Sequence, residues 1–319
     1  MQPEQQRKPH GVVITVALIA MGFAQLAIAV LQQGPDSDGY EASTTLVPAS
    51  QIVRQGKPHQ LFLRSSVALV VDEREGVILL DRNSDEQRSI ASLTKLMTAL
   101  VIIEADLPFD ELIDISWDDR DYLRGSRSRL RIGTVLTRYD MLLVALAASD
   151  NRAAAALART YPGGEDAIIA AMNRRAWELG MIYTRFVEPT GLSYDNVSTA
   201  RDLAKLIAAT REYPLIHHFS TRREFLVDDW GVDRVIVFRN TNALVHKNSW
   251  DVVLSKTGFT AAAGRCLLMR TRIANRPLAI ILLNSWGRLS KYGDANRIRK
   301  WLLTTERKIK TLAPTFASF

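Results

Sequence analysis

The sequence contains very little cysteine, which removes one common source of stability. Cys266 is the only cysteine among 319 residues, so no disulfide can form within the chain. Because Cys266 lies in an apolar, strand-like run, we expect it to be a small buried core residue. The fold must therefore depend on its hydrophobic core, which a chain with 47% hydrophobic residues is long enough to build.

Metal-binding and phosphate-binding patterns are also lacking. The five histidines show no HExxH-like spacing, and no second cysteine joins them. Neither a structural nor a catalytic zinc site is therefore expected. The sequence has no glycine-rich phosphate loop and no internal repeat. We expect the chain to work without a metal or another cofactor.

The excess of positive charge is modest, at +7, and part of it is local. The stretch RGSRSRLRIG at residues 124–133 gathers several arginines, which could bind an anionic polymer. It has no aromatic residues between the arginines, and single-stranded nucleic acid would need them for stacking. We interpret it as a solvated loop and strand face and expect no nucleic-acid partner.

The N-terminus has the features of an export signal. Arg7 and Lys8 precede a charge-free apolar run that contains the small-residue sequence AIA at 27–29. This order is typical of a secretory signal peptide, so we expect residues 1–30 to direct export. The run is also about as long as a membrane-spanning helix, which makes an uncleaved N-terminal anchor the alternative. Residues 31–60 are expected to be a polar lead-in.

The rest of the chain predicts a fold that mixes helices and strands. Runs rich in β-formers at 66–72 and 76–81 flank the charged turn EREG and predict a hairpin. Helical patterns cover 92–104, 137–149, 151–161, 165–180 and 198–213, β-type runs follow at 233–238, 250–259, 264–273 and 276–285, and a helix at 291–306 comes last. Because short connections favour antiparallel neighbours, we expect an α/β (α+β) fold. Both ends of the chain would form one sheet, with helices inserted between them.

A serine and a lysine lie one turn apart at the start of the first of these helices, SIASLTKLMTAL. Ser92 and Lys95 would share one helix face. Burial lowers the pKa of a lysine, so Lys95 could take the proton of Ser92 and make it a nucleophile. The alternative is a serine N-cap followed by a solvated lysine, since this spacing alone is a weak signal.

Two later motifs favour the catalytic interpretation. ASDN supplies Ser149 and Asn151 at a helix junction, and SKTG supplies Lys256, Thr257 and Gly258 on a strand. Each has an ordinary structural explanation, as a helix cap or a surface charge. Their joint occurrence, in this order and on these elements, is the pattern of serine acyl transfer.

Each residue of the motifs then has a predicted role. Ser92 is the nucleophile and Lys95 its base, while Ser149, helped by the charge of Lys256, passes a proton to the leaving nitrogen. Asn151 would hold Lys95 and the substrate amide. The pair Thr257 and Lys256 would bind a substrate carboxylate, Gly258 would let a substrate backbone pass close to the strand, and the N–H groups of Ser92 and Phe259 would bind the oxyanion.

These motifs, together with long stretches such as DMLLVALAASDNRAAAALARTYPGG and KTGFTAAAGRCLLMRT, resemble the low-molecular-mass penicillin-binding proteins, which are serine D-Ala-D-Ala peptidases. The resemblance covers about residues 64–303 and is greatest to the endopeptidases among them. It implies the serine β-lactamase/DD-peptidase fold, with a five-stranded antiparallel sheet flanked by helices beside a helical subdomain. It also implies a periplasmic enzyme that acts on peptidoglycan peptides and is inhibited covalently by β-lactams.

On this basis we expect a catalytic domain over 61–305 and a tail over 306–319, without the β-rich second domain and amphipathic C-terminal membrane helix of related carboxypeptidases. The expected reaction is cleavage of D-Ala–meso-diaminopimelate cross-links through an acyl-serine intermediate. A D-Ala-D-Ala carboxypeptidase, a β-lactamase and a catalytically silent wall-binding protein are the alternatives. Glu188 lies where class A β-lactamases have a water-activating glutamate. However, EPTGL departs from their Glu-x-x-Leu-Asn pattern, so we interpret Glu188 as structural.

Overall fold

The computed structural model describes residues 46–312. The expected signal peptide or anchor at 1–30, the first half of the expected lead-in and residues 313–319 lie outside this range. None of the helices within it is both long and apolar enough to cross a bilayer.

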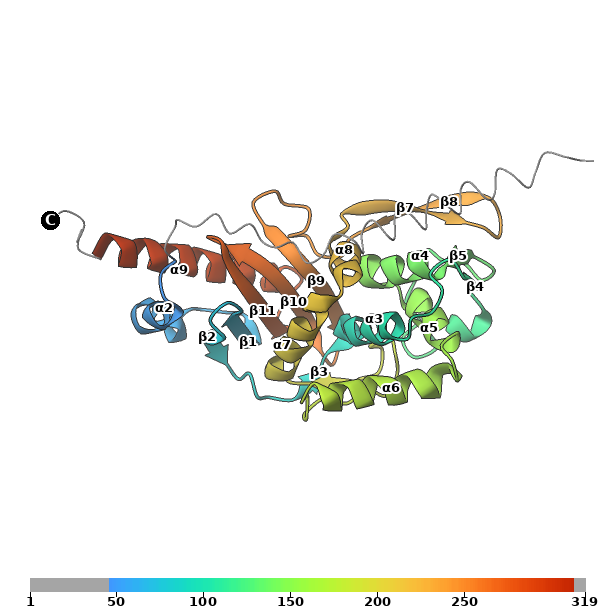
Figure 1. Cartoon of the computed structure of the whole chain (residues 1–319), viewed down its shortest axis with the longest axis horizontal. Coiled ribbons are helices and arrows are strands. Elements are labelled where there is room, and N and C mark those ends of the chain that lie inside the picture. The colour runs from blue at the N-terminus through green and yellow to red at the C-terminus, as the bar shows by residue number, and fades with distance from the viewer. Residues whose placement is uncertain (1–45, 313–319) are drawn as a thin grey trace, which may run out of the picture. The chain divides into compact units, whose positions relative to one another are not determined.

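Five antiparallel strands form the central sheet, in the order β2-β1-β11-β10-β9 (Figure 1). The strands are β1 (Ser65–Asp72), β2 (Val77–Arg82), β9 (Asp251–Thr260), β10 (Gly264–Ile273) and β11 (Arg276–Ser285). Strand β1 pairs with β11, so that Leu69 lies opposite Ile281. This pairing joins the first and last strands of the described residues, and the predicted five-stranded antiparallel sheet is confirmed.

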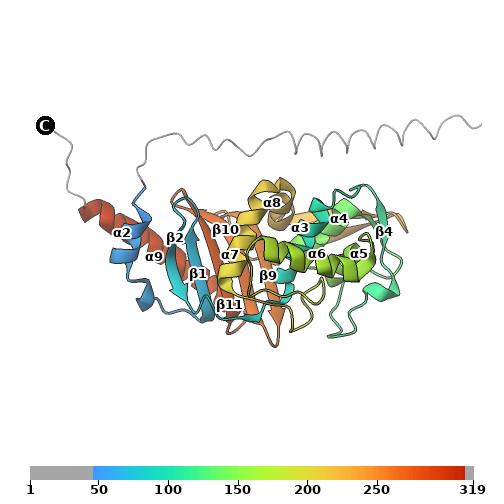
Figure 2. The same ribbon diagram turned by 60° about the horizontal axis from the view of Figure 1, so that its bottom comes forward.

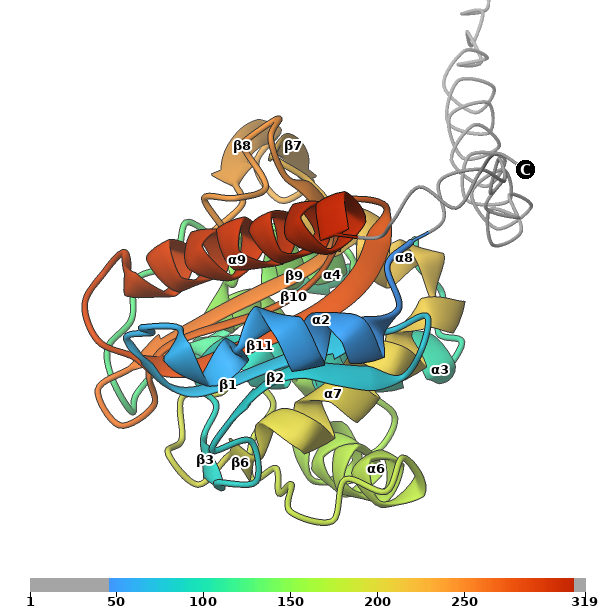
Figure 3. The same cartoon turned by 90° about the vertical axis from the view of Figure 1, so that its left-hand side faces the viewer.

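Helices cover both faces of this sheet, and the central strands are therefore buried on both sides. On one face lie α2 (Ala49–Gly56) and the long helix α9 (Ser290–Leu312), which Figure 3 shows above the sheet. Leu267, Met269 and Ile298 belong to the core on this face. On the other face lies α7 (Ala200–Ala209), seen in front of the sheet in Figure 2. Cys266 is fully buried in β10, as predicted, and burial raises the pKa of its thiol to about 11.

The helical subdomain follows the first hairpin. Its helices are α3 (Thr94–Glu104), α4 (Arg138–Leu143), α5 (Asn151–Arg159), α6 (Gly164–Glu178) and α8 (Pro214–Thr221). Three small two-stranded sheets accompany them: β3 (Arg88–Ser89) with β6 (Val197–Ser198), β4 (Leu112–Asp114) with β5 (Val135–Thr137), and β7 (Glu224–Asp229) with β8 (Arg234–Arg239). The expected strand at 233–238 is β8, which pairs with the unpredicted β7 and stays apart from the central sheet.

The structure differs from the predicted boundaries at both ends of the domain. The last part of the expected polar lead-in forms α2, in which Ala49 and Ile52 are fully buried. The expected tail from residue 306 continues as α9 to Leu312. Helix α2 has few apolar residues because it covers the core with one narrow side, which explains why its composition alone suggested a polar lead-in.

A buried arginine connects these two ends to the sheet. Arg276 has no exposed surface, and its Nε donates to Glu306 Oε1 at 3.0 Å. Its other nitrogens pair with Asp72 and donate to the carbonyl oxygen of Val47. This one side chain therefore joins the start of the described chain, the first strand and the last helix.

We expect Arg276→Met to lower the free energy of unfolding by about 3–5 kcal/mol, because Asp72 and Glu306 would remain buried without their cation. Urea denaturation measures this loss. Arg239→Met is the matched control, since it breaks an exposed ion pair with Glu224 and should cost less than about 1 kcal/mol. Similar small losses in both variants would contradict a structural role for the buried pair.

Candidate active site

Ser92 lies in the short turn Ala91–Leu93 that leads into α3. Ala91 has a φ of +48°, a left-handed conformation that side chains with a Cβ rarely adopt. Two glycines pack against this turn. A Cβ on Gly191 would lie 2.1 Å from the Ala91 oxygen, and one on Gly258 would lie 3.1 Å from the Ser92 nitrogen. The absence of a side chain at Gly258 thus lets strand β9 approach Ser92. This contact within the protein is additional to the close approach of a substrate backbone that the sequence predicted for Gly258.

Lys95 lies beside Ser92, as its spacing predicted. Its Nζ is 3.3 Å from Ser92 Oγ, and it donates to Asn151 Oδ1 and to the Thr190 carbonyl oxygen, each at 2.6 Å. The side chain is 1% exposed. Burial lowers the pKa of Lys95 to about 8, although the charges of Glu188 and Asp150 oppose this change. The expected contact between Lys95 and Asn151 is therefore present.

The second serine and the second lysine also lie together. Lys256 Nζ donates to Ser149 Oγ at 2.7 Å. Ser149 ends the π-helical turn Val144–Ala148 with a φ of 59°, and Asp150 then caps α5. A π-turn is rare and often marks a functional site. Burial, followed by the nearby charges of Lys95 and Lys291, holds the pKa of Lys256 well below its usual value.

The remaining predicted residues lie further along β9, at the edge of the sheet. The hydroxyl oxygens of Thr257 and Thr241 are 2.7 Å apart, so Thr241 is a neighbour that sequence reasoning missed. Phe259 is 55% exposed, and the guanidinium of Arg265 lies 4.1 Å from the centre of its ring. Because β9 is an edge strand, an extended peptide could pair with it.

Sequence reasoning also missed two loops that complete the site. The first is the basic stretch, which contains neither helix nor strand and so is not the expected strand face. Its Ser126 Oγ accepts from Asn151 Nδ2 at 2.7 Å, and its Ser128 Oγ donates to Asp150 Oδ2 at 2.7 Å. The serines between the arginines were the available signal.

The second loop, 187–196, carries Thr190, and Glu188 holds it in shape. The Glu188 carboxylate accepts from the backbone nitrogens of Thr190 at 2.7 Å and Gly191 at 2.6 Å, and from Asn196 Nδ2 at 2.7 Å. These donors all come from its own loop. The contacts agree with the interpretation of Glu188 as structural.

We expect Gly191→Ala to lower the free energy of unfolding by at least about 3 kcal/mol. It combines a left-handed φ of +82° with a backbone clash at Ala91. Gly125→Ala is the control, because its φ is +63° but a Cβ there would meet nothing within 4 Å. That variant should lose only about 1–2 kcal/mol. Thermal unfolding of both proteins measures the difference, and equal losses would exclude the close approach.

The known proteins that are similar to this chain in sequence or in structure are peptidases, transpeptidases or penicillin-binding proteins. The chain is 48% identical over 260 residues to a D-alanyl-D-alanine endopeptidase of Pseudomonas aeruginosa, which covers 82% of this chain and 84% of that protein. The crystal structure of the Streptomyces K15 DD-transpeptidase is similar, with a TM-score of 0.71, 25% identity and coverage of 76% of this chain and 98% of that one. So is penicillin-binding protein D2 from Listeria monocytogenes in its ampicillin-bound form, with a TM-score of 0.65, 27% identity and coverage of 76% and 99%.

The match to a family model agrees with these relatives and with the resemblance stated above. The model for D-alanyl-D-alanine carboxypeptidases, Peptidase S11, matches residues 54–286, which contain all three motifs. The fold is that of the DD-peptidases, and the chain belongs to the Peptidase S11 family of serine D-Ala-D-Ala peptidases.

Proposed function

We propose that Ser92 attacks the amide that follows a D-alanine and that Lys95 is its base. The observation that carries this proposal is the contact set of the Lys95 nitrogen. A neutral amine has two N–H bonds and one lone pair. Asn151 Oδ1 and the Thr190 oxygen accept the two N–H bonds, so the lone pair is left for Ser92 Oγ at 3.3 Å. The neutral form therefore satisfies the buried site and can accept a proton.

The other residues have roles in the steps that follow. The N–H groups of Ser92 and Phe259 stabilise the negative oxygen of the tetrahedral intermediate. Collapse of this intermediate needs a proton on the leaving nitrogen. Ser149 Oγ can donate it and take a proton back from Lys256 Nζ at 2.7 Å, because the lowered pKa of Lys256 makes its ammonium form a stronger acid. A water molecule then attacks the acyl-serine and gives one proton to Lys256 through Ser149, while Lys95 returns its proton to Ser92 Oγ. The product is released with a new carboxyl group.

We further propose that the substrate is a D-Ala–meso-diaminopimelate cross-link of peptidoglycan, which makes the protein a DD-endopeptidase of the periplasm. The linked D-centre of such a cross-link keeps its own carboxylate. The hydroxyls of Thr257 and Thr241 are suited to bind it, and a bound carboxylate would favour the charged form of the neighbouring Lys256. A terminal D-Ala-D-Ala peptide carries the same carboxylate, so carboxypeptidase activity is the alternative. The relative at 48% identity is named an endopeptidase, which favours the cross-link.

The first test concerns the base. Below about pH 8 Lys95 is protonated and cannot accept the proton of Ser92. We therefore expect the rate of acylation by a fluorescent penicillin to rise about tenfold per pH unit from about pH 6 and to level off near pH 8. Lys95→Met should lower this rate roughly 10²–10⁴-fold.

Ser92→Ala is the companion variant in the same assay. It should remain folded but lose all covalent labelling, because no nucleophile would remain. Labelling of Ser92→Ala, or a rate independent of pH below 8 in the unmodified protein, would show that the nucleophile or the base is a different residue.

The second test concerns the substrate. Protein without residues 1–30 should convert cross-linked dimeric muropeptide to monomers faster than it releases D-Ala from pentapeptide, with products identified by mass spectrometry. Release of D-Ala with the dimers left intact would make the protein a carboxypeptidase. Rapid turnover of penicillin that is lost in Glu188→Ala would instead indicate a β-lactamase.

A further inference from the structure

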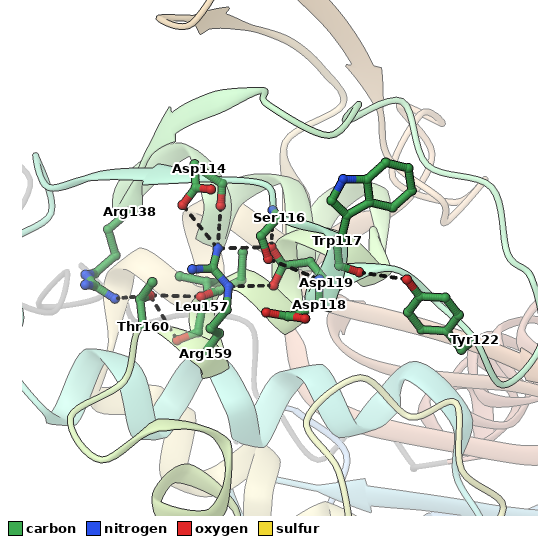
Figure 4. Close-up of polar contacts among 11 residues, drawn as sticks. Asp114, Ser116, Trp117, Asp118, Asp119, Tyr122, Arg138, Leu157, Arg159 and Thr160 are labelled. Atoms are coloured by element: carbon green, nitrogen blue, oxygen red, sulfur yellow. Dashed lines mark hydrogen bonds and ion pairs between the residues drawn. The ribbon is translucent and has the colours of Figure 1, made fainter.

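Exposed aromatic side chains gather on the loop between β4 and β5. Trp117 is 62% exposed and Tyr122 70% exposed. Arg120 lies between them, with its guanidinium carbon 6.0 Å from the Trp117 ring centre and 5.6 Å from that of Tyr122. We call these three residues the aromatic platform. In Figure 4 the rings of Trp117 and Tyr122 lie to the right of the packed Asp119 and Arg159 side chains and point away from them.

The base of the aromatic platform is held by buried polar contacts. Asp119 is 3% exposed, and its carboxylate accepts from Arg159 Nε and Nη2, each at 3.0 Å. The same carboxylate accepts from the Ser116 backbone nitrogen at 2.7 Å (Figure 4). The Tyr122 hydroxyl donates to the Trp117 carbonyl oxygen at 3.2 Å. These contacts fix the backbone of the loop beneath Trp117, and the Tyr122 ring is tied to it by its hydroxyl.

The same loop continues directly into the active site. Ser126, four residues after Tyr122, accepts the hydrogen bond from Asn151. Four residues can span at most about 14 Å, so Tyr122 lies within that distance of Ser126. Arg124 Nε also donates to the Leu192 carbonyl oxygen at 2.6 Å, which links this loop to the one that carries Thr190. In Figure 2 the loop and the Thr260 end of β9 project to the same side of the molecule.

We propose that the aromatic platform binds the glycan strand of peptidoglycan, to which the substrate peptides are attached. This inference rests on the proposed function. Sugar rings present apolar C–H faces that pack against aromatic rings, while their hydroxyl and acetamido groups can bond to Arg120 and the exposed Asp118. A stem of about three residues separates a scissile D-Ala amide from the sugar and spans roughly 10 Å. Ser126 is linked through Asn151 to Lys95 beside Ser92. Since Tyr122 lies within about 14 Å of Ser126, a stem of this length extends from the proposed nucleophile toward the aromatic platform.

Binding to glycan strands freed of peptide by an amidase tests the proposal without using catalysis. Three proteins are compared: the unmodified protein, a double variant with Trp117→Ala and Tyr122→Ala, and a single variant with Trp177→Ala. Trp177 is the matched control because it is 74% exposed but lies on α6. Fluorescence titration should show at least tenfold weaker binding for the double variant and unchanged binding for Trp177→Ala. Equal binding by all proteins, or equal loss in both variants, would overturn the proposal.

An activity measurement separates this inference from the proposed function. The double variant should keep its rate of penicillin acylation and its turnover of a sugar-free cross-linked peptide, which also shows that it is folded. Its turnover of intact cross-linked peptidoglycan should fall at least tenfold. If the unmodified protein cleaved neither substrate, the proposed function would fail, while the binding titration would still decide the role of the aromatic platform. Equal turnover of intact peptidoglycan by both proteins would contradict that role.

Discussion

The burial of Lys95 is the interaction on which the rest of the site depends. A change in pKa from 10.5 to about 8 corresponds to about 3 kcal/mol against the charged form. A shift of this size would let a lysine act as a base near neutral pH, which is the role proposed for Lys95. The shift requires that the amine be buried and that its N–H groups still find hydrogen-bond acceptors. Asn151 Oδ1 and the Thr190 carbonyl oxygen are these acceptors. Helix α3, the start of α5 and the 187–196 loop must therefore meet at one nitrogen atom.

Several features of the fold bring these three segments together at the Lys95 nitrogen. Glu188 shapes the loop that supplies the Thr190 carbonyl, and Gly191 lets that loop lie against the Ala91 backbone. Gly258 allows the edge strand to approach Ser92 from the other side. The left-handed Ala91 and Ser149 are consistent with this, since backbone strain is tolerated where close packing imposes it.

The sheet supplies the rigid part of this arrangement. Strand β9 carries Lys256, Thr257 and Phe259 and is held in register by β10, while no other strand of residues 46–312 pairs with its outer edge. The inserted helices bring the serines to the same edge. The basic stretch completes the site from a loop, because its Ser126 accepts a hydrogen bond from Asn151. Besides its arginines, this loop therefore contains two serines, Ser126 and Ser128, that form hydrogen bonds within the site.

The sequence by itself determined the central strands, the main helices and the three motifs. Strands buried on both faces read as continuous apolar runs, and acyl transfer requires particular side chains at fixed spacings. Only the tertiary structure decided the role of the Thr190 carbonyl, 95 residues from Lys95, and of Ser126 beside Asn151. Every residue has a carbonyl group, so its use leaves no mark in a sequence. Helix α2 was not predicted because it has few apolar residues, and Ile52 supplies much of its buried apolar contact. The packing of α2 against the sheet and α9 can be seen only in the tertiary structure.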